Sequence, residues 1–491
     1  YQKETGVTYG ILEFDLGDAT TLAVGGSYQN NNTRSPLWGA LPLYRTDGTQ
    51  TDYDVETSTS ADWSYWNGEY TNAFVELTHG LGGGWEAQAT LTHREMMSDS
   101  KLFYVYGTPN PDTPQSDLFA YPSRYELDNN QFIGDLRVSG PYQLFGREHQ
   151  AVVGASYWES DLNDLSRYGQ GIGTPIVDLE FWTGDYPEPA FDASVDGSDW
   201  VDRQKSAFAA TQFRLTDELA FIGGARVISL TSRGTTYGTS KDTEYSGETV
   251  PYAGLVLDIT DNVSAYASYA EIFDPQTEID INRDRIDPIE GTTRELGLKS
   301  AFYGGAVQTT VAVFETEQDN LAEAAGTIPA SVDTFYIGVD GIESRGYEVD
   351  VSGEVLPGLQ VAAGFTSVNI NGPEGDRART FTPERIARLS TAYQLRSIER
   401  LKVGASINWQ DDIYRYEGVA TTGAFAGAPI YVRQDSYARV NLMARYDVTS
   451  RFNAQLNLNN VTDEKYLTSL YWSQGYYGAP RNASLKLNWA F

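Results

Sequence analysis

The sequence predicts an all-β fold, a transmembrane antiparallel β-barrel, and three observations carry that prediction. Apolar and polar side chains alternate in segments of about ten residues along the whole chain. The links between these segments are alternately short and long. The composition is 13% aromatic and includes 47 Gly and 19 Pro, an inventory that suits strands and turns.

The alternation is clearest near the C-terminus, where Leu485, Leu487 and Trp489 alternate with Lys486 and Asn488. A helix would instead need apolar residues at i, i+3, i+4 and i+7. In a barrel the apolar row faces lipid and the polar row faces the lumen. By the same argument we expect Leu456, Leu458, Val311 and Val313 to point outward and Gln455 and Asn457 to point inward.

The pattern predicts nineteen strands. In order, they span residues 3–16, 20–31, 68–79, 84–97, 127–140, 148–160, 202–215, 218–233, 246–259, 263–273, 293–302, 306–318, 341–354, 358–370, 383–394, 400–414, 437–447, 451–461 and 481–491. Each strand is bounded on one side by a tight turn rich in Gly, Asp, Asn or Pro, as at 80–84, 260–262, 303–305 and 357–358.

The other links are long and polar, near residues 32–67, 98–126, 161–201, 274–292, 319–340, 415–436 and 462–480. We expect short and long links to alternate strictly. Tight periplasmic turns and long extracellular loops are typical of outer-membrane barrels, whereas long structureless loops are uncommon in compact soluble domains. The links therefore favour a membrane barrel over a soluble sandwich.

The strand count indicates part of a larger barrel. Bacterial single-chain barrels contain an even number of strands. Here the first strand ends at a short turn, and the last strand ends on the same, periplasmic side of the barrel. An odd count of nineteen is therefore consistent with a chain that lacks an odd number of strands at its N-terminal end. We expect residues 1–491 to be one partial barrel domain.

Charge and composition exclude several functions. Asp and Glu outnumber Lys and Arg by 67 to 35, for a formal charge of −32, which argues against a nucleic-acid partner. The chain has no Cys and only 3 His, so we expect no metal site and no cofactor. No acid/base or nucleophile constellation stands out among the many carboxylates. The sequence predicts a protein that is not an enzyme.

Aromatic residues in the long links are the candidates for ligand binding, because a bulky ligand with an apolar shell needs flat aromatic faces. Many aromatics in a barrel instead form girdles at the membrane interface, and this alternative applies to those at strand ends. The candidates are Trp38, Tyr44, Trp66, Tyr104, Tyr106, Trp472 and Tyr476, with Arg283, Arg285 and Arg415 as weaker candidates for a polar edge.

The link at 161–201 is strongly acidic, with nine carboxylates and one base, Arg167. A solvated loop is the simpler interpretation, and a divalent-cation site is the functional alternative, although no EF-hand spacing supports it. Such loops would repel strongly anionic ligands and tolerate neutral or cationic ones.

Six segments, taken as they stand, resemble TonB-dependent siderophore receptors, above all those for ferric coprogen, ferric rhodotorulic acid and ferric pyoverdine. They are SYAEIFDPQ (268–276), IDPIEG (286–291) with ELGLK (295–299), FETEQDNLA (314–322), GIESRGYE (341–348), FTPER (381–385), and LNLNNVTDEKY (456–466) with YYGAPRN (476–482). The segment around Trp38 also resembles a loop that supplies ligand-facing aromatics in this family.

The resemblance implies a 22-strand barrel with an N-terminal plug and a TonB box, located in the outer membrane of a Gram-negative bacterium. It implies that the first three strands and the plug are absent from this chain. The expected ligand is a ferric siderophore of hydroxamate or mixed type, with iron only as cargo. The expected partners are the TonB complex through the missing plug, outer-membrane lipid, and the barrel assembly machinery through a C-terminal signature ending in Phe491. Uptake of a cobalamin or an oligosaccharide, and a passive porin, are the alternatives.

Overall fold

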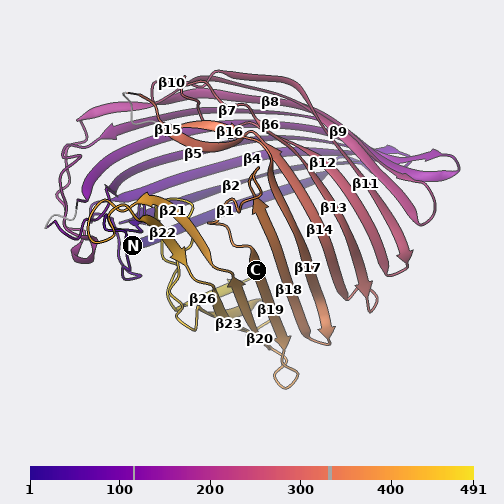
Figure 1. The fold of residues 1–491 in the computed structure, drawn as a ribbon. Helices are drawn as coiled ribbons and strands as arrows, with labels where there is room; N and C mark the ends of the chain where they lie inside the picture. The colour runs from indigo at the N-terminus through magenta and orange to yellow at the C-terminus, as the bar shows by residue number, and fades with distance from the viewer. Residues whose placement is uncertain (114–116, 330–333, 491) are drawn as a thin grey trace.

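A computed structural model of the chain describes residues 1–113, 117–329 and 334–490. One antiparallel sheet dominates it, and Figure 1 shows this sheet curling back on itself, so that β13 and β14 pass in front of β1 and β2 in this view. Each long strand pairs with the long strands before and after it in the chain, as in β1 with β2 and β24 with β26. Among the described residues, no helix is both long enough and apolar enough to cross a membrane.

The first part of the sheet contains β1 (Gln2–Asp15), β2 (Thr20–Arg34), β4 (Tyr65–Gly82), β5 (Trp85–Tyr106), β6 (Phe119–Leu144), β7 (Arg147–Tyr168), β8 (Ser194–Arg214), β9 (Leu219–Thr236) and β10 (Thr239–Ser240). It continues through β11 (Thr243–Thr260), β12 (Val263–Asp274), β13 (Ile289–Phe302), β14 (Val307–Asp319), β17 (Ile342–Leu356), β18 (Leu359–Asn371), β19 (Arg385–Gln394), β20 (Leu401–Gln410), β23 (Tyr437–Asp447), β24 (Phe452–Asn459) and β26 (Asn482–Trp489). Of these twenty strands, β10 is a two-residue extension paired with β9, so the predicted nineteen strands are confirmed.

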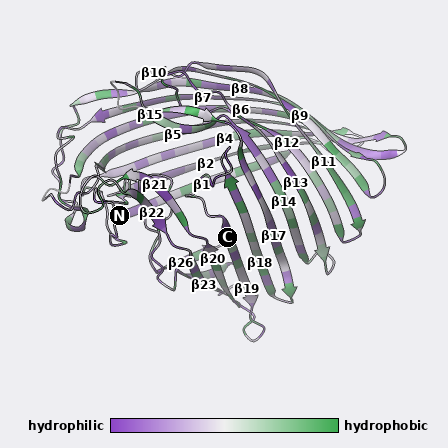
Figure 2. Cartoon of the chain, in the orientation of Figure 1, coloured by the Kyte–Doolittle hydropathy of each residue, from purple (hydrophilic) through white to green (hydrophobic). Residues whose placement is uncertain are grey.

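The register confirms the predicted faces. Leu485 and Leu487 lie opposite Leu456 and Ala454 on β24, whereas Lys486 lies opposite Gln455. On β14, Val311 and Val313 lie opposite Leu298 and Leu296 of β13. Leu296 is 58% exposed and Val313 is 51% exposed, as expected for side chains that face lipid. Figure 2 shows the alternation of hydrophobic and hydrophilic residues along these strands.

The predicted end of one strand and the predicted strict alternation of links are both wrong. The strand expected at 400–414 ends at Gln410, because Asp411 receives a 2.6 Å hydrogen bond from Nε of Arg385 and turns the chain. The links do not alternate strictly, because β9 and β11 are joined by residues 237–242, a link no longer than the turn at 395–400.

Strands β5 to β8 also extend beyond their predicted ends, into the links expected at 98–126 and 161–201. On β5 the reason is that both faces carry large apolar or aromatic side chains: Phe103 and Val105 are fully buried beneath loops, while Tyr104 and Tyr106 on the opposite face are half-buried. Such a segment shows no apolar–polar alternation.

The long links carry small elements of their own. These are β3 (Leu41–Pro42) paired with β25 (Gln474–Gly475), β15 (Leu321–Thr327) paired with β16 (Thr334–Val339), β21 (Ile413–Val419) paired with β22 (Pro429–Gln434), and the 3-10 helix η1 (Leu179–Phe181).

The two apolar cores lie among these links. The first core comprises Leu41, Tyr53, Ala61, Phe103, Val105, Leu118, Ala120, Ile176 and Leu179. The second comprises Leu43, Ile413, Val432, Leu467 and Leu470.

Candidate ligand-binding site

A cavity of about 1080 Å³ opens where two long links meet. Its lining residues are Trp38, Gly39, Ala40, Tyr104, Tyr106, Tyr121, Tyr125, Ser469, Tyr471, Trp472, Gln474, Gly475 and Tyr476. Eight of these residues are aromatic and none is charged. We call this space the aromatic cavity.

Pairing between the links places the aromatic residues together. Strand β3 follows Trp38, and strand β25 lies between Trp472 and Tyr476; the two strands pair through Pro42–Gln474 and Leu41–Gly475. This short ladder fixes residues from opposite ends of the chain against the tops of β5 and β6. The cavity therefore depends on the folded loops and not on one local sequence.

Contacts between rings hold Trp38 in place. Its ring lies edge to face with Tyr104, at 5.6 Å between centroids, and with Tyr125, at 5.2 Å. The Tyr104 hydroxyl donates a 2.9 Å hydrogen bond to Oε1 of Gln474. Gly39 has a φ of +70°, and a Cβ there would lie 2.0 Å from the Tyr104 ring, so only glycine fits.

The opposite wall of the cavity is more exposed. Trp472 is 67% exposed, Tyr471 is 53% exposed and Tyr476 is 40% exposed. Partial burial raises the pKa of the Tyr476 hydroxyl, so that it stays protonated and can donate a hydrogen bond. One wall is thus rigid and packed, while the other presents ring faces to a ligand.

The structure brings together five of the ten candidate residues: Trp38, Tyr104, Tyr106, Trp472 and Tyr476. Sequence reasoning missed Tyr121 and Tyr125 of β6. Tyr121 and Tyr125 are four residues apart, and Tyr104 and Tyr106 on β5 are two residues apart. Either even spacing would place both members of the pair on one face of a strand. That signal is usable only if 98–126 is taken as strand.

The other candidates lie outside the aromatic cavity. Tyr44 packs against the second core, and burial raises the pKa of its hydroxyl. Trp66 lines a separate recess of about 780 Å³ and donates a 3.0 Å hydrogen bond to Ser98. Arg283 and Arg285 lie in the link between β12 and β13, where Nη1 of Arg285 donates to the Gln276 carbonyl. Arg415 lies on β21, with its Nε 3.2 Å from Glu417.

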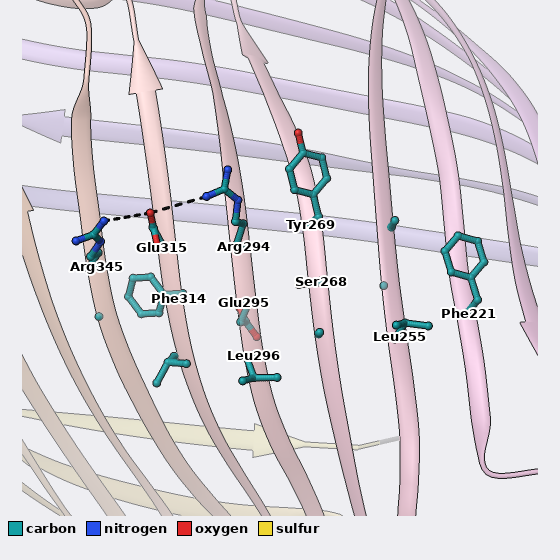
Figure 3. A pocket seen from close by; sticks show the side chains of 15 residues that line it. Phe221, Leu255, Ser268, Tyr269, Arg294, Glu295, Leu296, Phe314, Glu315 and Arg345 are labelled. Carbon is teal, nitrogen blue, oxygen red and sulfur yellow. Dashed lines mark hydrogen bonds and ion pairs between the residues drawn. The ribbon is translucent and has the colours of Figure 1, made fainter.

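Another hollow, of about 680 Å³, lies on the outer wall of the sheet (Figure 3). Leu255, Leu296 and Val313 line it, and all three belong to the exposed outward row. At its upper end Glu315 lies 3.9 Å from Arg294 and 3.3 Å from Arg345. This hollow faces the lipid side and is no part of the aromatic cavity.

The acidic link is partly strand. Asp161, Asp164, Asp196 and Asp199 lie on β7 and β8. In the loop itself, Glu180 pairs with Arg45 at 3.5 Å and Glu188 with Lys101 at 2.5 Å. Across the described residues there is no group of three or more His, Cys, Asp or Glu side chains that could hold a metal ion.

Comparisons with known proteins agree with this architecture. The family model described as TonB dependent receptor-like, beta-barrel matches residues 8–461. The ferric-pyoverdine BN7/BN8 receptor of Pseudomonas putida is 34% identical, and the ferripyoverdine receptor of Pseudomonas aeruginosa is 32% identical. Both alignments cover 100% of this chain and 60% of the relative, so the chain spans less than two thirds of the length of these curated proteins.

Among solved structures, the pyoverdine outer-membrane receptor of Pseudomonas aeruginosa PAO1 bound to pyoverdine superposes with a TM-score of 0.89 at 31% identity, covering 100% of this chain and 71% of that one. The resemblance to TonB-dependent receptors noted in the sequence is confirmed, and the matching family and relatives are receptors and not enzymes. The chain belongs to the TonB-dependent receptor β-barrel family of the Gram-negative outer membrane.

Proposed function

We propose that this chain forms the barrel of a receptor that takes up a ferric siderophore of hydroxamate or mixed type. The observation that carries the proposal is the aromatic cavity, eight of whose lining residues are aromatic and none charged. The pyoverdine receptors to which the chain is similar support a siderophore as the ligand.

The chemistry of the cavity suits a ferric chelate with an apolar shell. Ring faces of Trp472 and Tyr471 offer stacking surfaces, while tyrosine hydroxyls and the Gln474 amide offer directional hydrogen bonds. A strongly anionic ferric catecholate would find no cation among the lining residues, and the chain as a whole carries a charge of −32. Iron is cargo in this proposal, held by the siderophore and not by the protein.

In this proposal, segments of the full-length protein other than this chain couple transport to energy and close the barrel. We infer that a plug contacts the TonB complex and that about three further strands close the barrel. Among the described residues β1 pairs with β2 alone and β26 with β24 alone, which supports closure by additional strands. The proposed signal for the assembly machinery ends at Phe491, which lies outside the described residues.

Iron uptake in cells tests the proposal. A strain without its own siderophore receptors, expressing the full-length protein, should grow on a ferric hydroxamate as sole iron source and take up radioactive iron. Growth should stop when TonB is removed, because the transport step needs its energy. Growth on ferric catecholates alone would contradict the ligand class, and uptake that persists without TonB would contradict active transport.

A further inference from the structure

A pair of arginine side chains flanks one phenylalanine ring beside the aromatic cavity. The guanidinium carbon of Arg379 lies 5.8 Å from the centroid of Phe381, and that of Arg415 lies 5.9 Å from the same centroid. Phe381 lies edge to face with Tyr471, at 5.4 Å, and Tyr471 lines the cavity. Two rings, Phe381 and Tyr471, therefore link the guanidinium groups to the aromatic cavity.

This arrangement is held by packing. Phe381 packs against the second core, and the backbone N–H of Tyr414 donates a 3.0 Å hydrogen bond to the Thr380 carbonyl. Arg379 has a φ of +51°, a conformation that residues other than glycine seldom adopt and that persists where surrounding structure imposes it. The guanidinium groups of Arg379 and Arg415 thus lie beside a ring that packing holds in place, on backbone that the surrounding structure holds in place.

The positive charge at this point is incompletely neutralised. In the described ranges, Glu417 is the one carboxylate within ion-pair distance of either guanidinium, and it pairs with Arg415. The Glu417 side chain is 5% exposed, and among the described residues its Oε1 makes the ion pair with Nε of Arg415 but no hydrogen bond. Burial raises the pKa of this carboxyl group, which weakens its ability to balance two cations.

We propose that Arg379 and Arg415 bind a carboxylate arm of the siderophore while its aromatic or apolar body occupies the aromatic cavity. Two like charges beside one ring repel each other, and an anion between them relieves that repulsion with charge-assisted hydrogen bonds. The site selects ferric chelates that carry one peripheral carboxylate over chelates that are neutral throughout. This inference rests on the proposed function and specifies its ligand further.

A matched pair of synthetic ligands tests the inference. One is a ferric trihydroxamate that bears a flat aromatic group and a free carboxylate, and the other is its carboxamide twin. Binding is measured to the full-length receptor, to R379Q and R415Q, and to R396Q, which removes one positive charge at the turn between β19 and β20. The wild type should prefer the carboxylate by about tenfold, since a hydrogen bond between charged groups is worth roughly that when partly exposed.

In R379Q and R415Q the ratio of the affinities for the carboxylate and the carboxamide should fall to near one, because affinity for the carboxylate drops while affinity for the carboxamide is unchanged. In R396Q the ratio should match that of the wild type. R415Q leaves Glu417 without its ion-pair partner and can therefore fail to assemble. Arg379 has no ion-pair partner in the described ranges, so in that case R379Q alone tests the inference. A wild type without preference, or a preference that survives in R379Q, overturns the inference while ferric-chelate binding still supports the receptor. Binding of neither twin contradicts the proposed function and removes the inference with it.

Discussion

Trp38 is the residue on which the rigid wall of the aromatic cavity depends. Its ring contacts Tyr104 and Tyr125, and the adjacent Gly39 permits the close approach. Interface energetics in general are dominated by a few aromatic anchors of this kind, surrounded by weaker contacts.

We therefore predict that Trp38→Ala weakens ferric-siderophore binding by about thirtyfold, because removing a buried aromatic anchor typically costs about 2 kcal/mol or more. Barrel assembly should stay intact, as shown by unchanged heat-modifiable migration on a gel. Trp66→Ala is the matched control, because Trp66 lines a separate recess and should leave affinity near the wild-type value. Equal losses in both variants would show that the site is wider than the aromatic cavity.

The candidate residues show where residue-level prediction from sequence succeeds and fails. An aromatic residue in a long polar link is a usable signal, and it identified Trp38, Trp472 and Tyr476. The same signal also selects Tyr44, which packs against a core of the loops. Sequence does not distinguish a ring that packs under a loop from one that lines a cavity, because the distinction depends on contacts between β3 and β25 across the whole chain.

At the scale of elements, the hairpin β21–β22 contains a pH-sensitive carboxyl group, that of Glu417. Burial raises the pKa of Glu417 above its value in an unfolded chain, so folding favours the protonated form. Its contribution to stability is complete below the pKa of an unfolded glutamate and is lost as pH rises through the raised pKa.

Hydrogen exchange over residues 413–434 should therefore show decreasing protection as pH rises above about 4.3, the ordinary pKa of glutamate, after correction for intrinsic rates. Glu417→Gln should remove this pH dependence and give stronger protection than the wild type at higher pH. Protection that rises with pH in the wild type would mean that the ion pair with Arg415 dominates over burial.

The strand faces make a second prediction for elements. Val311→Arg places a charge in the outward row between Leu298 and Val349, and should destabilise the folded barrel by about 2–4 kcal/mol if it lies near the bilayer midplane. Thr310→Arg, one residue away, points to the lumen and lies opposite Asp350. It should cost much less in denaturant unfolding from vesicles. A larger loss for Thr310→Arg would reverse the assigned faces.

The strands themselves were predictable because a lipid-facing row and a lumen-facing row impose alternation on the sequence. The tops of β5 to β8 were not, because the segment around Phe103 is buried on one face and lines the cavity on the other. The hairpin β21–β22 was also missed, because Asp411 ends β20 through a contact with Arg385, which is distant in the sequence.

For the whole molecule, charge and shape point to the same class of ligand. The chain carries a net charge of −32, while the cavity at its mouth is uncharged and aromatic, with two arginine residues beside it. Field effects of this size act on the approach and selection of ligands more than on folding. We therefore expect the ligand to be a bulky ferric chelate of low overall charge.

Binding of a ferric hydroxamate and of a ferric catecholate to the purified full-length receptor distinguishes the proposed ligand class from the alternative. Quenching of tryptophan fluorescence is a suitable readout, because Trp38 and Trp472 line the aromatic cavity. We expect saturable quenching by the ferric hydroxamate, with an affinity about tenfold or more above that for the catecholate, and a reduced response in Trp472→Ala. Tighter binding of the ferric catecholate, or saturable quenching that Trp472→Ala leaves unchanged, would contradict this expectation.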